Sequence, residues 1–231
     1  MPETRTHVSN RVLRTPRAAA IAGILFALLL GTSYVLLQIS IPAGSFDASD
    51  WLAEQVGAVS LALTLLPFAG IAYLWFMGVM RDRLGHLEDQ FFSTLFFGSG
   101  LLYLAMTFAS AAIAGGILIV YAFDPELLTN SGVYVFSRAI IYKFNNVYAM
   151  RMAGMQMIVL GTIWVRTQVM PRWLAVITFV FALMLLISIG LTQWIVMIFP
   201  TWVFMISAYI LYLNFRHQKG EVKRDGLTVE H

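Results

Sequence analysis

The chain has 231 residues, of which 59% are hydrophobic and only 12% are charged. Soluble domains are typically about half apolar and about one quarter charged, so this chain carries more apolar surface than a soluble fold of its size can bury. The net charge is only +3, and we exclude nucleic-acid binding as the main function. The mean hydropathy of +0.77 predicts a protein that crosses a lipid bilayer several times.

The predicted membrane spans lack the residues that usually carry chemistry. The sequence contains no cysteine, which excludes iron–sulfur clusters and thiolate metal sites. All four histidines fall in predicted inner loops and tails, which disfavours a haem held between helices. The spans contain no carboxylate apart from Glu54 at the rim, which disfavours proton-driven transport. We therefore expect no cofactor and no metal site, we assign no catalytic residue, and we rank an enzyme last.

Six stretches reach or approach the roughly 20 apolar residues that a bilayer core requires. They predict an all-α bundle of six transmembrane helices, at residues 18–39, 52–80, 91–123, 146–165, 173–191 and 195–215. Residues 1–17 form a basic N-terminal segment before this domain of residues 18–215, and residues 216–231 form a tail. The first apolar run is too long for a signal peptide, so we interpret it as an uncleaved span.

Two of these spans contain residues that shape helices. Pro67 interrupts the second span and predicts a kink, with Thr64 placed to donate to the carbonyl that proline leaves free. The third span carries the small-residue pairs Ala111 and Gly115, and Ala112 and Gly116, which favour close packing against another helix of the bundle.

The basic residues sort to one side of the predicted bundle. With the N-terminus inside, most of the 15 lysines and arginines lie in the N-terminal segment, the two inner loops and the tail. The positive-inside rule then predicts that both termini are cytoplasmic. The same residues make a basic inner face suited to anionic lipid. We expect a multi-pass protein of a bacterial plasma (inner) membrane.

The segment 133–144 allows two interpretations. Ser131 is suited to cap a helix, and no Gly or Pro follows Gly132 until Gly154, so the fourth helix can begin near Gly132. Alternatively, residues 133–144 form a separate interfacial helix, because Val133, Phe136, Ile140 and Phe144 make one apolar stripe.

Arg151 is the most prominent candidate for a functional site. It lies about five residues below the outer boundary of the fourth span, where charges are costly and often functional. Tyr148 shares its helix face at about 100° per residue. This face is suited to an anionic headgroup or a carboxylate ligand, with Asn145 and Asn146 adding hydrogen bonds.

Two structural roles for Arg151 compete with this hypothesis. Its side chain can extend to the headgroups. It can also form an ion pair with Glu54 or Asp50 and so join the second and fourth helices.

The fourth and fifth spans carry a resemblance to a known family. Residues 154–161 form a Gly-bounded helix, Arg166, Thr167 and Gln168 follow, and residues 170–175 read Met-Pro-Arg-Trp-Leu-Ala. This stretch resembles a bacterial six-helix membrane family known only as a domain of unknown function, whose pattern ends in Pro-Arg-Trp-Leu-Gly. Ala175 stands where that pattern has Gly, and residues 17–26 resemble the family's first span. The resemblance implies a six-helix bundle in the inner membrane, without an activity or catalytic residues.

Three classes of function remain at this point. The first is a non-catalytic protein that binds a membrane protein partner through its outer loops and helix faces. The second is a carrier or receptor for a small anionic or lipid-like ligand, with an outward-facing pocket around Arg151. The third is a membrane enzyme without haem or thiol chemistry.

Overall fold

The computed structural model describes residues 15–40, 49–85, 90–130, 132–168, 170–187 and 193–228. Every regular element in these ranges is helical. In chain order the elements are α2 (Thr15–Ser40), α3 (Ser49–Gly85), α4 (Gln90–Phe123), α5 (Pro125–Asn130), α6 (Val133–Lys143), the π-helix η1 (Phe144–Ala149), α7 (Met150–Thr167), α8 (Arg172–Ile187), the 3-10 helix η2 (Gln193–Met197) and α9 (Ile198–Thr228).

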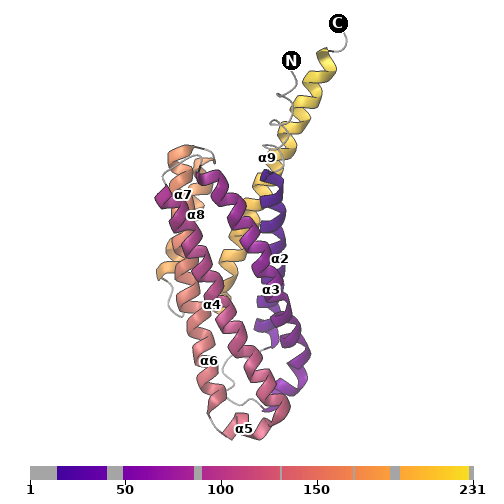
Figure 1. The fold of residues 1–231 in the computed structure, drawn as a ribbon, viewed down its shortest axis with the longest axis vertical. Helices are drawn as coiled ribbons and strands as arrows, with labels where there is room; N and C mark the ends of the chain where they lie inside the picture. Colours follow the sequence, from indigo (N-terminus) through magenta and orange to yellow (C-terminus); the bar gives the residue numbers. More distant parts are fainter. Residues whose placement is uncertain are drawn as a thin grey trace, which may run out of the picture.

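The helices form an elongated bundle (Figure 1). Helix α2 packs against α3 and α9, α3 packs against α4, and α4 packs along α6, η1 and α7, while α8 packs on α7. The start of α2 and the far end of α9 lie at one end of the molecule, and α5 lies at the other (Figure 1). The α5 end is built mainly by α3, α4, α5 and α6, because α8 is short and α9 begins well away from α5.

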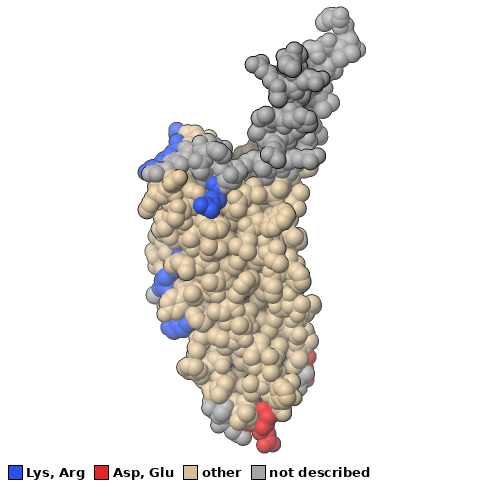
Figure 2. Space-filling view, in the orientation of Figure 1, with Lys and Arg blue, Asp and Glu red and all other residues tan. Residues whose placement is uncertain are grey.

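Four of the described helical segments are long and apolar enough to cross a membrane: Ala18–Ser40, Glu54–Arg81, Gln90–Phe123 and Trp194–Arg216. Helix α8 is apolar but shorter. Figure 2 shows a broad surface with little charge, with Asp and Glu at the α5 end, and with Lys and Arg at the opposite end and on one flank between the two ends. These features confirm the all-α class and the apolar membrane helices predicted from the sequence.

Residues 133–167 form one continuous helical segment. The joints at Phe144 and Met150 both have right-handed helical backbone angles, with φ near −62°. The structure therefore has the first of the two arrangements considered for residues 133–144, an extension of the fourth helix. The extension contains a π-helical turn that the sequence did not predict, and such turns often occur at functional sites.

Local residue choices explain the short connections at the α5 end. Asp124 precedes Pro125 and accepts a hydrogen bond at its Oδ1 from the N–H of Leu127, 3.0 Å away, which caps α5. Gly132 adopts φ +69°, which glycine allows without strain, and turns the chain into α6. The predicted cap Ser131 lies outside the described residues.

Two expectations about the second and third spans need correction. Helix α3 continues through Pro67, but the Thr64 hydroxyl donates to the carbonyl of Ser60 at 2.8 Å and not to the carbonyl of Leu63 that proline leaves without its donor. A Cβ added to Gly115 or Gly116 would meet no atom within 4 Å. These two glycines therefore do not mediate close packing between the described helices.

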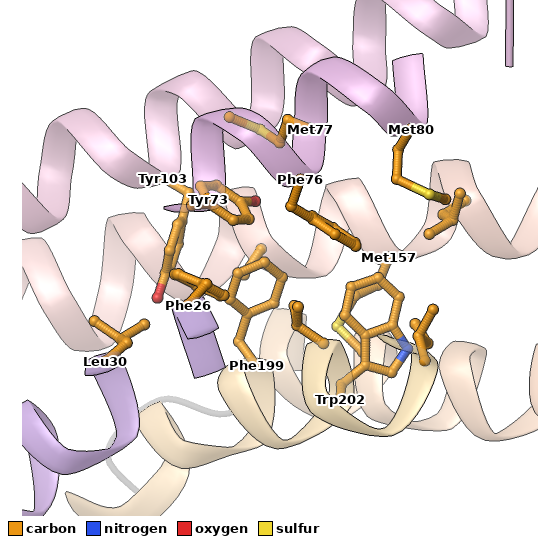
Figure 3. Close-up of a cluster of buried hydrophobic side chains, with 14 of the residues drawn as sticks. Phe26, Leu30, Tyr73, Phe76, Met77, Met80, Tyr103, Met157, Phe199 and Trp202 are labelled. Carbon is orange, nitrogen blue, oxygen red and sulfur yellow. The ribbon is translucent and has the colours of Figure 1, made fainter. Parts of the chain in front are cut away.

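The centre of the bundle is an aromatic cluster that joins α2, α3, α4 and α9 (Figure 3). Phe26 stacks on Tyr73 with ring centroids 4.4 Å apart, and Tyr103 meets Phe199 at 4.5 Å. The Tyr73 hydroxyl donates to Oε1 of Gln156, so a side-chain hydrogen bond joins α3 to α7 inside this cluster. Gly100 makes room for it, because a Cβ there would lie 2.6 Å from Nε2 of Gln156.

A smaller second cluster stabilises the α5 end. Ile117, Leu128 and Tyr134 are buried together there, with Val56 and Ile141 packed against them. The molecule therefore has two apolar cores along its length, one at the centre and one near α5.

The buried hydrogen bond between Tyr73 and Gln156 generates a prediction. Tyr73→Phe leaves the Gln156 oxygen without a donor, and we expect a loss of about 1–3 kcal/mol in the free energy of unfolding. Adding Gln156→Leu removes the orphaned group, so the double variant should lose less than the sum of the two single variants. Unfolding of the purified chain in detergent measures this coupling, and strictly additive losses would refute it.

Candidate functional site

A cavity of about 190 Å³ lies between the two apolar cores. Residues of α2, α3, α4, α6 and η1 line it, together with Val196 of η2. Its polar lining residues are Tyr34, Gln38, Thr107, Ser110, Tyr134, Arg138, Tyr142, Asn145 and Asn146. The cavity between the two cores is therefore lined by one basic residue and several neutral hydrogen-bonding groups.

One continuous helix supplies most of the polar wall. Arg138, Tyr142 and Asn145 follow one another at intervals of four and three residues, which places them on one helix face. The π-turn η1 begins at Phe144 and brings the next residue, Asn146, to the cavity as well. The other walls are mainly apolar and come from α2, α3 and α4.

The Arg138 guanidinium is held at the α5 side of the cavity. Its Nη1 donates to the hydroxyl of Tyr134 at 3.4 Å, and its Cζ lies 6.0 Å from the centre of the same ring. Arg138 is half-buried, and a guanidinium is charged at every physiological pH. The cavity therefore has a permanent positive charge at one end.

The two asparagine amides are only partly satisfied. Nδ2 of Asn145 donates to Oγ of Ser110 at 2.7 Å, and Nδ2 of Asn146 donates to the carbonyl of Tyr142 at 3.3 Å. The Oδ1 atoms of both residues are shielded from solvent and accept no hydrogen bond in the described part of the chain. An unsatisfied buried acceptor costs about 1–3 kcal/mol, so a donor that reaches these oxygens would be favoured.

Two other unsatisfied groups in the described bundle have no space beside them. Nε2 of Gln156 and Oγ of Ser207 also lack partners. Gly100 packs against the first, and Gly23 packs so closely against the second that an added Cβ would lie 2.0 Å from Oγ. Neither residue lines the cavity. Among the described residues, Asn145, Asn146 and Tyr34, whose hydroxyl also has no partner, combine an unsatisfied polar atom with a place in the cavity lining.

The sequence-predicted site residues are divided between two places. Asn145 and Asn146 line the cavity, whereas Tyr148 and Arg151 do not. Tyr148 is 54% exposed, and Nη1 of Arg151 donates to the carbonyl of Val147 in its own helix at 3.2 Å.

The ion pairs suggested for Arg151 involve Glu54 and Asp50. Glu54 is exposed and forms no ion pair with Arg151 in the described part of the chain. The side chain of Asp50 lies outside the described residues.

The residues that sequence reasoning missed are Arg138 and Ser110. Arg138 lies between the third and fourth predicted spans, and Ser110 lies in an apolar span whose sequence gives no sign of a cavity. The spacing of Arg138, Tyr142 and Asn145 indicates one polar face only under the first interpretation of residues 133–144, in which they extend the fourth helix.

The described residues contain no group of three or more His, Cys, Asp or Glu side chains placed to hold a metal ion.

Comparison with protein-family models, with curated proteins and with solved structures finds no match for this chain. The family resemblance suggested by residues 154–175 therefore stays a prediction, and the candidate site is defined by its geometry alone.

The hydrogen bond between Asn145 and Ser110 joins η1 to α4 and can be tested against a matched serine. Ser110→Ala removes the hydrogen bond that the Asn145 amide makes across this wall, so we expect a loss of about 1–3 kcal/mol in unfolding free energy. Ser99→Ala is the control, because the buried Ser99 hydroxyl donates only to carbonyls of its own helix. Thermal unfolding in detergent measures both variants, and equal losses would contradict a role for this link.

Proposed function

We propose that the chain is a six-span protein of a bacterial plasma membrane, with both termini on the inner side. Four described helical segments are long and apolar enough to cross a membrane, and α7 and α8 supply the two further crossings. The proposed inner end is basic: Arg81 lies over the ring of Phe97 at 5.1 Å and Arg166 over Phe92 at 4.8 Å. This end is suited to anionic lipid headgroups.

Reporter fusions test the orientation. A fluorescent protein fused to the C-terminus should fold and fluoresce in the cytoplasm, because positive inner segments retain it there. Alkaline phosphatase fused at the same position should be inactive. Active phosphatase at the C-terminus would reverse the proposed topology.

The same orientation sets the depth of the cavity. Arg138 precedes Arg166 by 28 residues in the continuous segment from α6 to α7, which at 1.5 Å per residue corresponds to about 42 Å. This length matches the about 40–45 Å of a bilayer with its headgroup layers. Arg166 at the inner headgroups therefore places Arg138 at the outer headgroups and the asparagines somewhat deeper.

We further propose that the protein binds a small anionic amphiphile in this cavity, as a receptor or carrier. The observation that carries the proposal is the composition of the walls. Arg138 and the asparagine amides lie on one helix, opposite apolar walls from α2, α3 and α4. A cation suits an acidic headgroup, and the apolar walls suit a hydrocarbon chain. The cavity lining contains neither a carboxylate nor a histidine.

Binding of a single-chain alkyl phosphate tests this function. Dodecyl phosphate should raise the unfolding temperature of the protein in maltoside detergent, whereas dodecyltrimethylammonium, with the same chain and opposite charge, should not. Arg138→Gln should weaken binding about 10-fold or more, since hydrogen bonds to charged groups contribute about 1.5–3 kcal/mol. Lys143→Gln is the matched control, because Lys143 is exposed on the same helix and does not line the cavity.

A second pair of variants tests the location of the site. Ala114→Phe places a ring in the cavity and should abolish stabilisation by the phosphate, whereas Ala112→Phe, at an exposed position of the same helix, should preserve it. If the first variant binds dodecyl phosphate as well as the second does, the ligand does not occupy this cavity.

A membrane partner protein is the second candidate function. Phe123 is 87% exposed and Phe136 is 68% exposed near the α5 end, where the 34-residue α4 exceeds the roughly 20 residues of a bilayer crossing. Apolar side chains outside the bilayer favour contact with another protein. A protein that functions only through such contact would show no stabilisation by dodecyl phosphate.

A further inference from the structure

We propose that the cavity's ligand is a single-chain phosphate amphiphile with a free hydroxyl between its phosphate and its chain, the chemistry of a lysophospholipid. This inference rests on the proposed function, because it specifies which anionic amphiphile the cavity favours. Three features of the described residues support it: the unsatisfied acceptors, their spacing from Arg138, and the size of the cavity.

Two of the unsatisfied groups beside the cavity are amide oxygens, which require a donor on the ligand, whereas the third, the Tyr34 hydroxyl, can donate as well as accept. The orientation of the Asn146 amide is fixed, because its Nδ2 donates to the backbone carbonyl of Tyr142, which can only accept. Its Oδ1 therefore remains an acceptor without a donor. A carboxylate or a fully ionised phosphate has no N–H or O–H for this oxygen, whereas a hydroxyl does.

The spacing of the polar groups limits where the donor lies on the ligand. Asn145 and Asn146 follow Arg138 by seven and eight residues, which is about 10 Å along a helix. The Arg138 guanidinium lies on the side of Tyr134, so the donor of the ligand must lie farther from the α5 end than its acid group. A hydroxyl between the phosphate and the hydrocarbon chain of the ligand meets this requirement when the phosphate binds at Arg138.

The volume of the cavity favours one chain over two. At about 190 Å³, it is smaller than the about 300–1,000 Å³ of pockets for drug-sized ligands. It accommodates a glycerol phosphate and the beginning of one hydrocarbon chain. A diacyl lipid would bring a second chain and an ester in place of the free hydroxyl, which removes the donor that Asn146 lacks.

Four probes separate these requirements in binding measurements on the full chain in maltoside detergent. They are 1-acyl-glycerol 3-phosphate, its 2-deoxy analogue without the hydroxyl, diacyl phosphatidic acid, and glycerol 3-phosphate without a chain. We expect the 1-acyl compound to bind about 3–10-fold more tightly than its 2-deoxy analogue, the effect of one hydrogen bond. The diacyl lipid and the chain-free phosphate should both bind more weakly than the 1-acyl compound.

The variant Asn146→Ala tests whether Oδ1 of Asn146 accepts the hydrogen bond from the hydroxyl of the ligand. The hydrogen bond that this variant loses lies within one helix, so the fold should persist, as its unliganded unfolding temperature will show. In this variant the 1-acyl compound and its 2-deoxy analogue should bind equally. In Lys143→Gln the preference for the hydroxyl should remain.

Each outcome separates this inference from the function on which it rests. The 1-acyl and 2-deoxy compounds could bind equally to the unchanged protein and both fail to bind to Arg138→Gln. That result would refute the role of the ligand's hydroxyl but would still support an anion-binding cavity. Equal or tighter binding of glycerol 3-phosphate overturns the lipid source, and tighter binding of the diacyl lipid overturns the single chain. If neither dodecyl phosphate nor any of the four probes binds, the proposed function itself is overturned.

Discussion

Polar groups inside a helical bundle that crosses a lipid bilayer must find hydrogen-bond partners within the protein, because the hydrocarbon layer offers none. The helices satisfy this constraint for the backbone. Among the side chains, Tyr73 on α3 donates to Gln156 on α7, and Trp202 on α9 donates to Thr178 on α8 at 2.9 Å. These two hydrogen bonds, together with the aromatic cluster around them, hold the helices at the centre of the molecule.

The same constraint explains why the cavity between the two apolar cores is distinctive. Gln156 and Ser207 also leave polar atoms unsatisfied, but close packing beside Gly100 and Gly23 leaves no room for a ligand there. Asn145 and Asn146 lack partners at the edge of a cavity that also contains a cation. A missing partner, adjoining space and a charge occur together at this one place in the described part of the chain, which is why we assign the ligand to it.

Composition and charge predicted the helical membrane class, because hydropathy depends on residue type and hardly on tertiary contacts. They also drew attention to Asn145 and Asn146, which line the cavity. They could not find Arg138, because its role depends on the continuity of α6 with α7 through a π-helical turn, and no residue type specifies such a turn. Ser110 was equally hidden, since only tertiary packing brings it to Asn145. Arg151 attracted attention as a charge within an apolar run, yet it donates to a carbonyl of its own helix.

The most direct test of the account is an experimentally determined structure of the full chain in nanodiscs, with 1-acyl-glycerol 3-phosphate added. The account predicts ligand density in the cavity, with the phosphate within hydrogen-bond distance of Arg138 and the glycerol hydroxyl within hydrogen-bond distance of Oδ1 of Asn146. An empty cavity with an ordered phosphate beside Arg151 would contradict it, because the site would then lie on the outer face of the fourth helix.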